Sequence, residues 1–270
     1  MFERLKERGF EIEFRSHAKA ILSIDFPEVA EQLEGVLLSS TIPIEEIIGS
    51  GGGEAKGTQR LRRALASHEW RKHIFVVQRI IDGVEREAQS HEIDHVKTFA
   101  AGTIAFEIEW NNKDPFFDRD LENFKRLHAD GAISLGIIVT RGCSLHGSMK
   151  RLVRRFVDEH QVNSHDDMER IGLNRTRRQI ADVIKRVTRK KNPVPFRDAF
   201  VDHFVGDKFG ASTTHWGKLQ DRVLRGVGNP CPLVLIGLPD SLVTFGEDPQ
   251  EVKKLLEESE DDSESEKGFL

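Results

Sequence analysis

His91-Glu92-Ile93-Asp94 is followed, after a short interval, by Phe106-Glu107-Ile108-Glu109-Trp110. Polar and apolar residues alternate in both segments, which predicts two strands, 91–99 and 103–110, joined by a tight turn at 100–102. Side chains two residues apart on a strand point to the same face, so Glu107 and Glu109 project together. Pairing of the two strands as a hairpin brings Asp94 beside Glu107. The sequence therefore predicts three carboxylates on one patch of a sheet.

The flanking sequence predicts further elements on both sides of this hairpin. Before it, a basic amphipathic helix precedes another strand, and after it a helix with one apolar face leads to a strand that is apolar throughout. The predicted helices and strands are 10–15, 16–38 (interrupted at Pro27), 58–70, 74–81, 118–129, 133–139, 148–160, 175–188, 213–224 and 232–237. We expect an α/β fold with a mixed central sheet flanked by helices.

The three carboxylates have two interpretations. Two Glu residues in an E-x-E pattern on an amphipathic strand are usually a solvated face. Three carboxylates on one patch, however, repel each other unless a cation lies among them, and oxygen ligands suit Mg²⁺. The otherwise apolar character of 104–110 and the preceding Asp94 favour the second interpretation. The pattern therefore predicts a magnesium site that activates water for attack on a phosphate.

The order of elements and the carboxylate segments resemble the PD-(D/E)xK nuclease superfamily, and more closely the BglII/BstYI type of restriction endonuclease. The catalytic hairpin and the loop after it carry the similarity most strongly. Other segments resemble that family's N-terminal helical region and its later core strands. The segments are Ile93-Asp94, 106–116, 14–22, 29–33, 137–142 and 231–237.

This resemblance implies a restriction endonuclease that cuts both strands of double-stranded DNA at a short palindrome and acts as a homodimer. A cognate DNA methyltransferase would belong to the same system without being a stable subunit. Asp94 and Glu107 would bind Mg²⁺. Glu109 stands where the superfamily usually has Lys and the BglII type has Gln, so it would either contact a metal or orient and deprotonate the water. Ile93 replaces the proline of the superfamily motif.

Glu54 is a further candidate metal ligand, because the superfamily often adds an acidic residue from the helix before the hairpin. The alternative is an acidic residue at a helix start, favoured by the helix dipole. Gly51-Gly52-Gly53, just before it, predicts a flexible break.

Two loops are candidate DNA-binding segments. Asn111, Asn112 and Lys113 leave the catalytic strand, and an Asn amide can pair with adenine in the major groove. The alternative is a plain polar turn. The second segment, Thr213, Thr214 and His215, opens a predicted helix whose N-terminus can hold a phosphate or whose side chains can read bases. The alternatives are that Ser212 or Thr213 is only the N-cap of this helix and that His215 is a packed histidine.

Charge is distributed unevenly along the chain. The formal net charge is −5, yet residues 141–225 contain 19 Lys or Arg against 10 Asp or Glu. We expect this basic insertion, and Arg189, Lys190 and Lys191 in particular, to contact the DNA backbone. The alternative is a solvated face.

These features predict a single nuclease domain over 1–247, with a core at 54–140 plus 232–237 and a basic helical insertion at 143–228. Residues 248–270 are expected to be an acidic, disordered tail. The N-terminus lacks an apolar signal sequence and the two cysteines form no framework, so we expect a cytoplasmic protein. A repair or structure-specific nuclease and a non-catalytic DNA-binding protein are the alternative functions.

Overall fold

The computed structural model describes residues 1–49, 54–246, 250 and 252–256, and the chain divides into two compact units. The first unit comprises Met1–Ser39, Arg60–Cys143 and Thr214–Pro239. The second comprises the described parts of Ser40–Gln59, Ser144–Thr213 and Asp240–Leu270. The insertion predicted at 143–228 therefore coincides with the second unit only up to Thr213, because the segment that follows belongs to the first.

A six-stranded mixed sheet forms the centre of the first unit, in the order β1-β7-β6-β5-β4-β3. Strands β5, β6 and β7 are parallel, whereas β1 and the β3–β4 pair run antiparallel to their neighbours. The strands are β1 (Glu11–Arg15), β3 (Arg71–Ile81), β4 (Val84–Phe99), β5 (Gly102–Glu109), β6 (Leu135–Arg141) and β7 (Leu233–Leu238). The predicted α/β class with a mixed sheet is confirmed.

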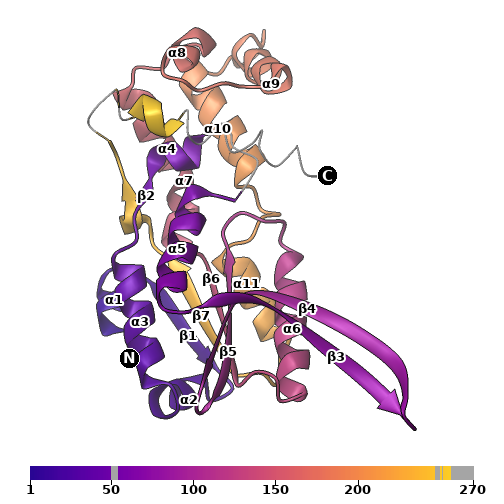
Figure 1. Ribbon diagram of the computed structural model, residues 1–270. Coiled ribbons are helices and arrows are strands. Elements are labelled where there is room, and N and C mark those ends of the chain that lie inside the picture. Colours follow the sequence, from indigo (N-terminus) through magenta and orange to yellow (C-terminus); the bar gives the residue numbers. More distant parts are fainter. Residues whose placement is uncertain (50–53, 247–249, 251, 257–270) are drawn as a thin grey trace. The chain divides into compact units, whose positions relative to one another are not determined.

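Helices cover both faces of this sheet, as Figure 1 shows. On one face lie α6 (Phe116–Ala129) and α11 (Trp216–Leu224), whose apolar residues share a core with those of the sheet. Phe117, Leu121 and Phe124 are completely buried there. On the other face lie α1 (Glu3–Glu7), α2 (Ala18–Ile24) and α3 (Pro27–Leu38). Because both faces are covered, every residue of β6 and β7 is buried, which explains why both sequences are apolar apart from Thr140 and Arg141 at the end of β6.

The β3–β4 hairpin is longer than the rest of the sheet and projects from it (Figure 1). The whole segment from Val84 to Ser90 is exposed. On β3, the large apolar side chains of Ile74, Val76 and Ile80 are also exposed. Helix α5 (Lys56–Ser67) precedes the hairpin and buries Leu61 and Leu65.

The second unit is mainly helical. Its elements are β2 (Ile42–Pro43), α4 (Ile44–Ile48), α7 (Cys143–Glu159, whose first residue belongs to the first unit), α8 (His165–Arg170), α9 (Arg177–Val187), α10 (Phe196–Lys208) and β8 (Val243–Thr244), which pairs with β2. The helices predicted at 148–160 and 175–188 are α7 and α9. Helices α8 and α10 were not predicted.

Two expectations from the sequence need correction or restriction. Helix α11 begins at Trp216 with His215 as its N-cap residue, so neither Ser212 nor Thr213 caps it. Within the predicted tail, residues 252–256 are helical and bury Val252 and Leu256. The disorder prediction for 257–270 and the Gly51-Gly52-Gly53 break both lie outside the described residues. In the described part of the chain, no helix is long and apolar enough to cross a membrane.

Candidate active site

The hairpin of β4 and β5 brings Asp94 and Glu107 together. The backbone N–H of Asp94 donates a hydrogen bond to Glu107 Oε1 at 3.3 Å. Just beyond this point the strands pair regularly, with His95 opposite Phe106. Glu109 follows two residues after Glu107 on β5 and therefore points to the same side of the strand. The three carboxylates proposed from the sequence thus lie on one part of the sheet.

An irregularity in β4 explains why the Asp94 N–H can reach a side chain. On β3, His73 lies opposite Ile93 and Arg71 lies opposite Val96, so Lys72 alone faces two residues of β4. Such a bulge interrupts the ladder of backbone hydrogen bonds and redirects a side chain, as is common beside active sites.

The same bulge brings the ammonium group of Lys72 near the carboxylates. Lys72 Nζ lies 2.5 Å from Glu92 Oε1. Its hydrogen bond with Glu92 raises the pKa of Lys72, and the negative charges of Asp94 and Glu107 raise this pKa further. Lys72 is therefore a positive charge at the exposed side of the site.

Burial perturbs the two glutamates strongly. Each is only 3% exposed. Burial, together with the charges of Asp120 and Asp94, raises the pKa of Glu107 well above its usual value. Burial followed by the charge of Asp120 raises the pKa of Glu109 to about 8. Removing a carboxylate from water disfavours its charged form. Bound protons or cations are therefore needed to neutralise the negative charge of this cluster.

Helix α6 contributes two residues that were not proposed from the sequence. Asp120 is 1% exposed, and its Oδ1 accepts a hydrogen bond from Arg119 Nε at 2.8 Å. The Arg119 guanidinium also lies 3.8 Å from Glu109 Oε1. The sequence did contain a signal: Asp120 lies three residues after Phe117 and four before Phe124, on the apolar stripe that helical spacing predicts to be buried.

The loop after β5 and the segment before α11 are joined by hydrogen bonds. Thr214 donates its backbone N–H to the carbonyl of Asn112 at 2.8 Å, and its hydroxyl accepts the Asn112 N–H at 3.1 Å. Arg141, at the end of β6, donates to the carbonyls of Trp110 and Thr214. Thr214 is completely buried, so it fixes the loop, whereas Asn112 and Lys113 are exposed.

Asn112 connects this loop to the carboxylates. Its side-chain amide donates a hydrogen bond to Glu109 Oε2 at 2.9 Å. The bond lowers the pKa of Glu109 and so opposes the larger effect of burial. A residue proposed to read bases therefore also orients a carboxylate of the site.

The donor set fits a divalent cation. It consists of carboxylate oxygens only, which Mg²⁺ prefers, and Asp120 Oδ2 is buried without a hydrogen-bond donor. Among the described residues, no three acidic, histidine or cysteine side chains are already arranged to enclose an ion. Binding therefore requires the carboxylate side chains to turn toward a common point, with Asp94 and Glu107 as the residues that would hold it.

A model of the family Restriction endonuclease BglII/BglIII matches residues 10–238. The chain belongs to this family. Among curated proteins, none matches the chain. Restriction endonucleases are hydrolases that act on double-stranded DNA, and the family generally uses a divalent metal ion. The hairpin of β4 and β5 and both polar loops lie within the matched residues.

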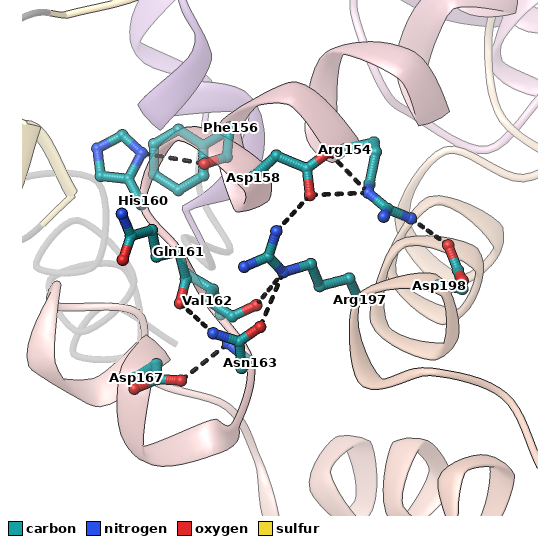
Figure 2. Close-up of polar contacts among 10 residues, drawn as sticks. All are labelled: Arg154, Phe156, Asp158, His160, Gln161, Val162, Asn163, Asp167, Arg197 and Asp198. Atoms are coloured by element: carbon teal, nitrogen blue, oxygen red, sulfur yellow. Dashed lines mark hydrogen bonds and ion pairs between the residues drawn. The ribbon is translucent and has the colours of Figure 1, made fainter.

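In this BglII/BglIII family chain, many arginines of the second unit have carboxylate partners within that unit. Figure 2 shows Arg154 bonded to Asp158 and Asp198, and Arg197 bonded to Asp158. Arg151 and Arg155 are paired in the same way with Asp240 and Glu159. Their charge is therefore partly neutralised locally, which the sequence count of basic residues did not reveal.

Three basic residues of the second unit differ from this group. Arg189, Lys190 and Lys191 are exposed, and no hydrogen bond or ion pair joins them to other described residues. They remain candidates for contact with a DNA backbone. Glu54 also belongs to the second unit, where its carbonyl accepts a hydrogen bond from Gln59; its role as a metal ligand stays a prediction.

Proposed function

We propose that this chain is a type II restriction endonuclease that makes double-strand cuts at a short palindromic site by Mg²⁺-dependent phosphodiester hydrolysis. One observation supports this most strongly: Asp94 and the buried Glu107 come from adjacent strands and are joined by the 3.3 Å hydrogen bond. A cluster of buried carboxylates costs several kcal/mol in an unoccupied state. An active-site role that requires a cation accounts for that cost.

Each residue of the site has a proposed role. Asp94 and Glu107 bind the ion, and Glu54 is a further candidate ligand. When bound, Mg²⁺ supplies a Lewis acid that neutralises charge on the scissile phosphate and lowers the pKa of water. Glu109, held by Asn112, either contacts a metal ion or orients that water and accepts its proton. Arg119 is 56% exposed beside Glu109, which suits contact with a phosphate oxygen.

The two polar loops are the proposed elements of sequence recognition. Asn111, Asn112 and Lys113 continue directly from the catalytic strand, so a base contact by these residues is coupled to the position of Glu109. Thr213 and His215 flank the buried Thr214, whose hydrogen bonds hold the second loop against the first. In the second unit, Arg189, Lys190 and Lys191 are proposed to contact phosphates independently of sequence.

The described part of one chain contains one buried carboxylate cluster, whereas a double-strand cut requires two such sites. A twofold homodimer on a palindrome supplies both sites with matching symmetry. Light scattering of the DNA complex should therefore give two chains per duplex. We further propose a cytoplasmic enzyme, because its substrate is DNA within the cell, paired with a cognate methyltransferase that is not a subunit.

Cleavage of phage DNA by purified protein tests the proposal. We expect discrete bands with Mg²⁺ and no cleavage with EDTA. Asp94→Asn and Glu107→Gln should abolish cleavage and leave DNA binding close to that of the parent. Asp130→Asn, at the exposed C-cap of α6, and Glu87→Gln, on the exposed hairpin, are the matched controls and should cleave normally. Full cleavage by Asp94→Asn, or an unspecific smear from the parent, would refute the assignment.

A further inference from the structure

Asp120 occupies an unusual place for an acidic residue. It lies on the buried stripe of α6, between Phe117 and Phe124, and is 1% exposed. An apolar side chain at this position would pack against the sheet at no electrostatic cost. Burying a carboxylate instead costs several kcal/mol unless a partner compensates for it. The position therefore demands a partner for the carboxylate.

Arg119 provides only part of that compensation. The guanidinium bonds to Asp120 Oδ1 at 2.8 Å, while Oδ2 is buried without a donor. A carboxylate that served only to anchor Arg119 could leave its second oxygen in contact with water, whereas Oδ2 is buried at an energetic cost. Oδ2 thus remains available for a ligand.

The neighbour of Asp120 on the sheet is another carboxyl group. Arg119 lies near both groups: its guanidinium is 2.8 Å from Asp120 Oδ1 and 3.8 Å from Glu109 Oε1. One guanidinium carries a single positive charge, so it cannot balance two buried carboxylates, and leaving such a charge unbalanced is costly. A divalent cation fits this pair, since its ligands are oxygens and its charge balances both groups.

Asp120 is also close to the other carboxylates of the site. After burial, its charge is the largest cause of the raised pKa of Glu107, ahead of that of Asp94, and likewise of Glu109. The acidic group of α6 therefore interacts with both glutamates of β5.

We propose that Asp120 is a ligand of the cation site, where its Oδ2 and the carboxylate of Glu109 bind a divalent metal ion beside Asp94 and Glu107. This inference rests on the metal-dependent activity proposed above. It makes helix α6, and not only the strand hairpin, a part of the site. The ion would neutralise the buried carboxylates of Glu109 and Asp120.

Mn²⁺ binding to the full-length protein, measured by calorimetry without DNA, tests this inference. Asp120→Asn should weaken Mn²⁺ binding by about tenfold or more. Glu122→Gln removes a carboxylate that pairs only with Lys125 and Arg126 on the same helix, and it should bind like the parent. Asp120→Ser provides a second variant without a buried amide, and the rise in melting temperature on adding Mn²⁺ provides a second readout.

The outcomes separate this inference from the proposed function. Parental Mn²⁺ affinity in both folded Asp120 variants, with normal metal-dependent cleavage by the parent, would overturn the role of Asp120 alone. Absence of both Mn²⁺ binding and cleavage in the parent would overturn both proposals. Weakened binding in the Asp120 variants, but not in Glu122→Gln, would support the inference.

Discussion

Glu109 should make the stability of the metal-free protein strongly dependent on pH. Its pKa is raised from 4.5 to about 8 in the folded state, mainly by burial. The folded protein therefore holds this proton more tightly than the unfolded chain does. The resulting stabilisation is complete below pH 4.5 and is lost as the pH rises toward the folded-state pKa.

The magnitude follows from the size of the shift. Each unit of pKa difference corresponds to roughly 1.4 kcal/mol, so the window between 4.5 and about 8 corresponds to on the order of 5 kcal/mol. Denaturant unfolding in EDTA, at pH values across this window, should show the free energy of unfolding falling as pH rises. Glu109→Gln carries no titrating proton at this position and should show a flatter profile, with the dependence that remains coming from the raised pKa values of Glu107 and Asp120. Added Mg²⁺ should flatten the profile of the parent.

Glu122→Gln controls for the loss of a carboxylate at the surface and should follow the parental profile. If Glu109→Gln has the same pH dependence as the parent, the protonation of Glu109 does not contribute to stability. The reasoning about its buried environment would then be wrong.

Two further predictions concern the second unit. Replacing Arg189, Lys190 and Lys191 by Ala should weaken binding to all DNA sequences alike. It should also reduce the slope of log affinity against log salt concentration by up to about 2.7, at about 0.9 per phosphate contact. An unchanged slope would show that these three side chains form only a solvated face. Leu256→Ala should lower the free energy of unfolding by ~2–5 kcal/mol because Leu256 is fully buried, whereas deletion of 257–270 should change it by less than about 0.5 kcal/mol.

The hairpin and the sheet could be predicted because their signals are local. The alternation around Glu107 and Glu109 is a period-two pattern, and the continuous apolar runs within β6 and β7 indicate strands buried on both faces. Asp94 could be placed beside Glu107 because a tight turn joins their strands. The bulge opposite Lys72 leaves no such pattern, since it depends on the register with β3.

Contacts between segments distant in sequence could not be predicted in this way. Asp120 reaches Glu109 only because α6 folds back over the sheet. Thr214 forms a hydrogen bond with Asn112, which lies more than a hundred residues earlier in the chain. The burial of Thr214 was therefore not evident from its local sequence, which resembles a helix start. Pairing of Arg154 with Asp158 is local and at helical spacing, but its bond to Asp198 depends on how α7 and α10 pack.

The projecting hairpin has a consequence for the protein at high concentration. Strand β3 is an edge strand, and an apolar edge offers free backbone groups on which strands of other molecules can stack into aggregates. Register shifts at Arg71/His73 and at Arg79/Ile80 lie on either side of the exposed Ile74 and Val76. Each shift twists the edge and breaks the regular spacing of its hydrogen-bonding groups. Ile74 and Val76 therefore lie on an edge where regular pairing with another molecule is confined to the stretch between the two shifts.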